Sequence, residues 1–131
     1  MNSNENSTHE NPAAQRAEAG TTGWENAVRL QLRATPDHAD FYALAGELVC
    51  TLRALDDLTR VLRRQVAGYA QGQRDRGRAL YDDTREVDPV ERLRVAAIQL
   101  EEFGSATVTA AEWANQFWST IGHIGVEDVA R

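Results

Sequence analysis

The chain has 131 residues, of which 42% are hydrophobic and 26% are charged, a composition typical of one globular domain with a modest core. Its net charge of −6 argues against a general nucleic-acid binder or a binder of anionic membranes. A single cysteine, Cys50, excludes an intramolecular disulfide, and we expect a reduced, cytoplasmic protein. The sequence has neither an 18-residue apolar run nor the apolar core of a signal peptide, so we expect no membrane span.

The N-terminal part of the chain changes character near its twentieth residue. Residues 1–20 are rich in Asn, Ser, Glu and Ala and carry almost no large apolar side chain, so we expect a disordered tail. Thr22 and Glu25 then form a capping-box pattern. The apolar residues that follow at helical spacing are Trp24, Val28 and Leu32. This pattern predicts a short amphipathic helix over about 23–34, within a single helical domain over 21–131.

A seven-residue apolar rhythm of nine positions, broken only by Thr59, indicates a long helix that packs against a partner helix. Its positions are Phe41, Ala45, Leu48, Leu52, Leu55, Thr59, Leu62, Val66 and Tyr69. Thr35-Pro36 supplies an N-cap and a proline at the first helical position, which predicts a helix over about 36–70. We expect Gly72 and Gly77 to end it.

The second long helix follows a polar connection over 71–88, which is longer than most helix–helix links and is therefore either mobile or functional. The sequence Asp88-Pro89-Val90-Glu91 is a strong helix start, and it predicts a helix over 89–121. Its heptad positions are Leu93, Ala96, Leu100, Phe103, Thr107, Ala110, Ala114, Phe117 and Ile121. Residues 104–109 have weak helix propensity, and a new helix capped at Thr109 is an alternative. The unbroken heptad phase favours one continuous helix.

These elements predict an all-α fold, a long antiparallel helical hairpin with heptad packing and a short N-terminal helix. Alignment of the two apolar stripes from the turn of the hairpin places Thr59 opposite Phe103. The same alignment places Thr107 opposite Leu55. Both stripes are wider than a two-helix contact requires, so we favour a homodimer with a four-helix core over a monomer.

Charge is concentrated at the elbow, where the polar connection joins the two long helices. Residues 60–78 carry a local charge of +5, and residues 82–102 carry −4. The arginines that we consider for contact with phosphate or an acidic partner are Arg64, Arg74, Arg76 and Arg78. Cations at a helix C-terminus also complement the helix dipole, and the neighbouring acids neutralise them. A solvated, self-paired elbow is therefore the other interpretation.

Trp113 and Trp118 are candidate interface anchors near the end of the second long helix, although their helical spacing makes burial in the core the more frequent outcome. Catalytic patterns are weaker. The three histidines are scattered, and the sequence has neither a Glu-x-x-His pair nor a Gly-rich phosphate loop. The acids of Asp37-His38-Ala39-Asp40 lie where the first turn of a helix favours negative charge. We therefore expect no enzyme, no metal and no cofactor.

Two segments carry a resemblance to known proteins, residues 41–48 (FYALAGEL) and residues 118–126 (WSTIGHIGV). They resemble stretches of small uncharacterised actinobacterial helical proteins, some of which are associated with mobile or conjugative elements. The resemblance covers about 24–127 and implies a cytoplasmic accessory protein. The hairpin is also similar in outline to helical secretion substrates with a Trp-x-Gly turn. None of the three tryptophans here is followed by x-Gly, so that function is not carried over.

Our leading hypothesis from the sequence is a non-enzymatic protein–protein interaction or scaffold module that self-associates as a homodimer and binds a protein partner not yet identified. The alternative is an accessory DNA-binding or regulatory protein that uses its Arg-rich elbow to contact nucleic acid. The two hypotheses place the functional surface in different regions, on the apolar stripes or at the turn of the hairpin.

Overall fold

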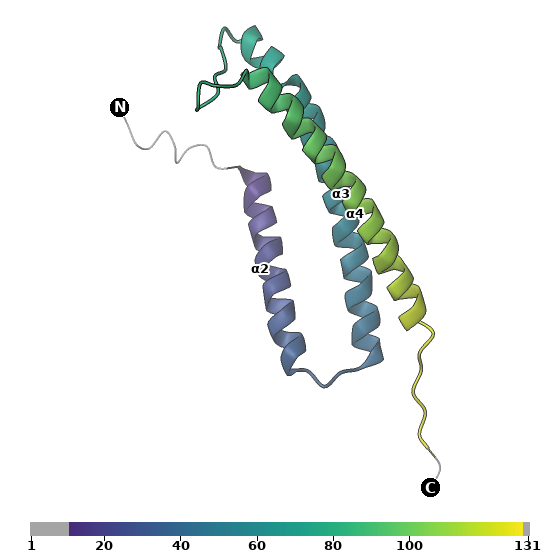
Figure 1. Ribbon diagram of the computed structural model, residues 1–131. Helices are drawn as coiled ribbons and strands as arrows, with labels where there is room; N and C mark the ends of the chain where they lie inside the picture. Colours follow the sequence, from purple (N-terminus) through teal and green to yellow (C-terminus); the bar gives the residue numbers. More distant parts are fainter. Residues whose placement is uncertain (1–10, 130–131) are drawn as a thin grey trace, which may run out of the picture. The chain divides into compact units, whose positions relative to one another are not determined.

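The computed structural model describes residues 11–129, which form three α-helices and contain no strand (Figure 1). The helices are α2 (Pro12–Arg33), α3 (His38–Asp75) and α4 (Pro89–Ile121). The expected all-helical fold with a long hairpin is confirmed. None of these three helices is both long enough and apolar enough to cross a membrane.

Helix α2 begins well before the expected start, because the preceding residue, Asn11, caps its first turn. The side chain of Asn11 accepts hydrogen bonds from the backbone N–H groups of Ala13 (2.9 Å) and Ala14 (3.2 Å). Pro12 occupies the first helical position, where its missing N–H costs nothing. This N-cap takes the place of the one predicted at Thr22, which lies inside α2.

One prediction for the N-terminal part of the chain is corrected. The expected disorder is wrong for 12–20, where alanine supplies four of nine residues and has the highest helix propensity. The rest of that expected tail, 1–10, lies outside the described residues. Among the described residues, the contacts within the chain separate 11–37 from 38–129.

Helix α3 runs five residues past its predicted end, through Gly72, and stops where the backbone turns left-handed. Gly77 has φ +71°, a conformation in which glycine bears no steric cost. The carbonyl of Gln73 accepts hydrogen bonds from the N–H groups of Arg76 (3.0 Å) and Arg78 (2.9 Å), which closes the helix end. The connection is therefore 76–88 rather than 71–88.

Helix α4 begins as its sequence predicts. The carboxylate of Asp88 accepts a hydrogen bond from the backbone N–H of Val90 at 3.0 Å, and Pro89 occupies the first helical position. The helix continues without interruption through 104–109, so the prediction of one continuous helix is confirmed and the new start at Thr109 is wrong.

Helices α3 and α4 pack along each other as an antiparallel hairpin whose register differs by one residue from the predicted one. A methyl group in place of the Gly104 hydrogen would lie 2.9 Å from Thr59 Oγ1, so Thr59 faces Gly104 and not Phe103. Near the open end, the Trp118 ring lies beside Gly46 in the same way. The predicted pairing of Thr59 is therefore wrong by one position, and Asp56 replaces Leu55 in the neighbourhood of Thr107.

We define the seam as the buried and half-buried positions at which the two helices face each other. On α3 these are Ala45, Val49, Leu52, Asp56, Thr59, Val66, Ala70 and Gln73. On α4 they are Leu93, Ala97, Leu100, Gly104, Thr107, Ala111, Ala114, Trp118 and Ile121. About half of the positions in each predicted heptad pattern are seam residues. Most of the other positions directly precede a seam residue in the sequence. Small seam residues let the backbones approach closely, and this excludes the larger residues beside them.

Candidate functional site

The large apolar residues excluded from the seam line one side of the hairpin, which we call the apolar face. Its α3 members are Leu48, Leu55, Leu58, Leu62 and Tyr69. Its α4 members are Phe103, Ala106, Ala110, Trp113 and Phe117. The exposed fraction of the three large aromatic residues on α4 is 52% at Phe103, 69% at Trp113 and 47% at Phe117.

These residues share one side because the same offset from the seam applies on both helices. Leu48 and Leu55 directly precede the seam residues Val49 and Asp56, just as Phe103 precedes Gly104. In an antiparallel pair of helices that use equivalent seam positions, residues with the same offset point to the same side of the pair. The apolar residues of the two helices therefore form one continuous surface. Sequence reasoning assigned most of these residues to the seam. At Phe103 and Tyr69 the small residues that follow, Gly104 and Ala70, are a signal that it missed.

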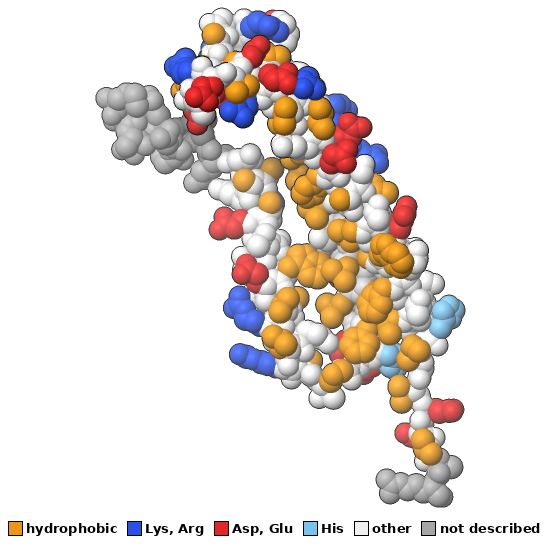
Figure 2. Space-filling view, in the orientation of Figure 1, with side chains coloured by type: hydrophobic (Ala, Val, Ile, Leu, Met, Phe, Trp, Pro, Cys, Tyr) orange, Lys and Arg blue, Asp and Glu red, His pale blue; other side chains and the backbone are white. Residues whose placement is uncertain are grey.

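Arginine is absent from the α3 positions of the apolar face, and the five arginines of this helix occupy the other sides. Arg53, Arg60 and Arg63 line grooves on the opposite side of the hairpin. Figure 2 shows hydrophobic side chains along α3 and α4, with Arg and acidic side chains gathered towards the elbow. A surface with this composition suits an apolar partner and not a polyanion.

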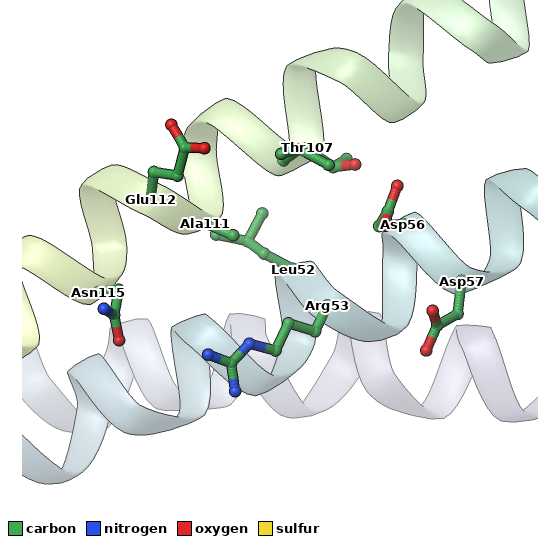
Figure 3. Close-up of a pocket in the computed structure, with 9 residues that line it drawn as sticks. Leu52, Arg53, Asp56, Asp57, Thr107, Ala111, Glu112 and Asn115 are labelled. Atoms are coloured by element: carbon green, nitrogen blue, oxygen red, sulfur yellow. The ribbon is translucent and has the colours of Figure 1, made fainter.

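The opposite side of the hairpin carries two shallow grooves of about 430 and 500 Å³. In the first, Asp56 and Thr107 point towards the space between the helices, whereas Arg53 and Glu112 point away from it (Figure 3). Asp56 forms an ion pair with Arg60 at 3.0 Å. Within residues 11–129 no group of three or more His, Cys, Asp or Glu side chains is placed to hold a metal ion. The grooves therefore offer hydrogen-bonding groups and an internal ion pair.

The two candidate tryptophans of α4 have different surroundings. Trp118 packs inside the hairpin, with its ring 3.2 Å from the position of a methyl group on Gly46. The centroid of the Tyr42 ring lies 5.7 Å from that of Trp118. Trp113, one turn earlier, lies on the apolar face and is largely exposed. Of the two, only Trp113 is placed as an interface anchor.

The indole Nε1 of Trp118 is buried and finds no hydrogen-bond partner among the described residues. An unpaired buried donor costs free energy, so this ring is held by packing and not by polar contacts. Its neighbours explain why: the ring fills the space that Gly46 leaves open between the two helices. Trp118 is therefore a structural residue of the open end of the hairpin.

The four candidate arginines at the elbow do not form one cluster. Arg64 lies ten residues before Arg74, or about 15 Å along the helix axis. Arg74 donates a hydrogen bond to the side-chain oxygen of Gln71 at 3.0 Å. Arg76 and Arg78 flank the left-handed Gly77 just after α3 ends. The tight turn brings the last three arginines near one another and leaves Arg64 separate.

The connection that follows is ordered around Asp82, a residue that sequence reasoning did not single out. Its carboxylate accepts hydrogen bonds from the backbone N–H of Thr84 (3.1 Å), from the Thr84 hydroxyl and from Arg92 Nε (2.7 Å). The Asp-x-Thr spacing is a turn signal that identifies such a residue. The Arg85 guanidinium lies 4.2 Å from the centroid of the Tyr81 ring.

These hydrogen bonds change the acidity of the buried carboxyl group. The Thr84 hydroxyl and, after it, the Arg92 guanidinium lower the pKa of Asp82 from 3.8 to about 2. Asp82 therefore stays ionised near neutral pH, and it ties the connection to the first turn of α4 through Arg92. This ion pair makes the elbow a fixed turn with part of its charge neutralised internally.

Comparison of the chain with protein-family models, with curated proteins and with solved structures finds no match. The candidate site is consequently defined by the geometry of this chain alone.

Proposed function

We propose that the protein is a non-enzymatic helical interaction module that self-associates through the apolar face of its α3–α4 hairpin. The observation that carries the proposal is the line of exposed aromatic and leucine side chains on one side of both helices. Contiguous exposed apolar patches on globular proteins are typical of interaction surfaces. Aromatic residues such as Phe103 and Trp113 are typical anchors within such surfaces.

Two further features support the apolar face over the grooves and the elbow as the functional surface. The face has no arginine on α3, which lowers the cost of removing it from water. The elbow carries its charges partly paired, as in the contacts of Asp82 with Arg92 and of Glu91 with Arg94. In the grooves, Asp56 is already paired with Arg60, and no group of His, Cys, Asp or Glu among the described residues is placed to hold a metal ion.

The experiment is sedimentation equilibrium on the full chain and on two matched substitutions in α4. Phe103→Ser removes a half-exposed aromatic residue from the apolar face. Val108→Ser removes a 41% exposed apolar residue from the opposite side and serves as the control. We expect a dimer for the wild type and for Val108→Ser, and a dissociation constant raised at least about tenfold for Phe103→Ser.

Circular dichroism on each variant checks that helix content is retained. Because both substitutions replace an exposed apolar residue on the same helix by serine, their propensity costs are similar. A wild-type protein that remains monomeric at high micromolar concentration contradicts the proposal. Equal weakening by the two substitutions contradicts the choice of face.

A further inference from the structure

Four of the five α4 residues of the apolar face are arranged symmetrically along the helix. Ala106 and Ala110 are small residues near the middle of the helix. The large rings of Phe103 and Trp113 lie at equal distances before and after them. A second α4 that runs antiparallel and crosses the first midway between Ala106 and Ala110 would place each Phe103 against the partner's Trp113. It would place each Ala106 against the partner's Ala110. The alanines then form a close contact at the centre, and the large aromatic rings meet on both sides of it.

The apolar residues of α3 have a corresponding symmetry. Leu55 and Leu58 flank a midpoint, and an antiparallel second α3 would place each against the other. The same alignment places Tyr69 against the partner's Leu44, and it pairs Leu62 with a small residue, Thr51. Across both helices, large side chains therefore meet large ones and Ala106 meets Ala110, whereas Leu62 meets a small residue.

The two midpoints lie almost level in the hairpin. The α4 midpoint is Val108. Because Thr59 faces Gly104 and Gly46 faces Trp118, the α3 residue opposite Val108 lies close to Leu55. The α3 midpoint lies one to two residues further along, a difference of about 2 Å at 1.5 Å per residue. A single two-fold axis across the face, perpendicular to both helices, therefore satisfies both symmetries.

From this coincidence, and resting on the proposed self-association, we infer that the occupant of the apolar face is a second copy placed head to tail. Helix α3 packs antiparallel on the partner's α3, and α4 packs on the partner's α4. The elbow of each copy then lies beside the open end of the other copy. The result is a four-helix core in which every neighbouring pair of helices runs antiparallel.

Charge complementarity selects this arrangement over one in which the two elbows lie side by side. The elbow end, residues 60–103, has nine arginines against eight acids, a net charge of +1. The open end, residues 38–52 and 111–129, has five acids and no Arg or Lys, a net charge of −5. The head-to-tail dimer brings unlike ends together twice, whereas the elbow-to-elbow dimer brings like ends together.

The size of the face matches what a stable dimer needs. With Leu44, which this arrangement adds to the apolar face, the contact extends about 38 Å along the helix axes to Tyr69, and two helices side by side are about 20 Å wide. The resulting area of about 750 Å² per copy is close to the roughly 800 Å² per partner of a standard specific interface.

The test is a distance measurement by double electron–electron resonance between spin labels in the full chain. Cys50→Ser removes the native thiol, and Ala79→Cys places one label at each elbow. In the head-to-tail dimer the two elbow labels are about 60 Å apart, because each lies about 30 Å from the dimer centre. Val108→Cys, on the polar side near the centre, gives a distance of about 30 Å in either orientation and reports the dimer itself.

The two labels separate the possible results. A long distance at position 79 with a short one at position 108 is the expected outcome. Short distances at both positions overturn the head-to-tail arrangement and leave self-association standing. Loss of dipolar coupling at both positions, with a monomeric mass, overturns both. In that case, protection of the Trp113 fluorescence from an added quencher would mean that another segment of the same chain covers the apolar face.

A mutant cycle tests the predicted contact directly. Phe103→Ala and Trp113→Ala each raise the dimer dissociation constant at least about tenfold. Because the two rings contact each other across the axis, the double variant is weakened by less than the product of the single effects. Phe103→Ala with Phe117→Ala is the control pair, since those rings do not meet in this arrangement and their effects multiply. A multiplicative result for Phe103 with Trp113 contradicts the proposed register.

Discussion

At the scale of single residues, Gly104 decides how α3 and α4 meet. In an open helix, replacing glycine by alanine stabilises the helix by up to about 1 kcal/mol. At Gly104 the new methyl group would lie 2.9 Å from Thr59 Oγ1, closer than atoms pack. Thr59 has little freedom to move, because its hydroxyl donates a hydrogen bond to the Asp56 carbonyl at 2.7 Å and its side chain is buried.

We therefore expect Gly104→Ala to lower the free energy of unfolding by about 1–3 kcal/mol, despite its better helix propensity. The measurement is urea denaturation followed by circular dichroism. Gly68→Ala is the matched control, because nothing lies within 4 Å of the added methyl group, and it should be neutral or stabilising. Stabilisation by both substitutions would mean that the helices are not in close contact at Thr59.

At the scale of elements, the connection between α3 and α4 is held by an ionised carboxyl group. Since the folded-state pKa of Asp82 lies below its ordinary value of 3.8, this group adds stability above that value. The stability is lost as the pH falls through 3.8 towards about 2, where the folded protein also binds the proton.

Asp82→Asn should therefore cost stability at neutral pH, and the cost should shrink as the pH falls through this range. The measurement is the free energy of unfolding of wild type and variant from about pH 5 downwards. Asp83→Asn, in the same connection but exposed, is the control for a general change in net charge. A difference between wild type and Asp82→Asn that does not vary with pH would show that the carboxylate does not act through its charge.

At the same scale, the helices show which sequence signals sufficed. The Asp88 cap with Pro89 was enough to predict the start of α4, because capping depends only on adjacent residues. The end of α3 was predicted too early, since Gly72 fits within the helix and only Gly77 has a positive φ. The start of α2 was predicted too late, because the lack of large apolar residues in 1–20 indicated disorder, whereas Asn11 caps a helix that begins at Pro12.

At the scale of the whole molecule, self-association links stability to concentration. If the folded chain is a dimer, unfolding separates the copies, and mass action stabilises the folded state as protein is added. We expect each tenfold rise in concentration to raise the thermal unfolding midpoint by about 3–5 °C. Differential scanning calorimetry over three decades of concentration measures this. Phe103→Ser should show a flatter dependence, and an invariant midpoint in the wild type would contradict self-association.

The sequence by itself determined the helical class, the hairpin and the half of each heptad pattern that lies in the seam, because periodicity and caps act over a few residues. Only the tertiary structure decided which flanking residues complete the seam. Gly104, Ala97 and Ala111 let the backbones approach, and that choice leaves Phe103 and Phe117 outside. A heptad pattern does not distinguish the predicted seam from the observed one, because both bury an apolar stripe. The sizes of the side chains that meet across the contact select between them.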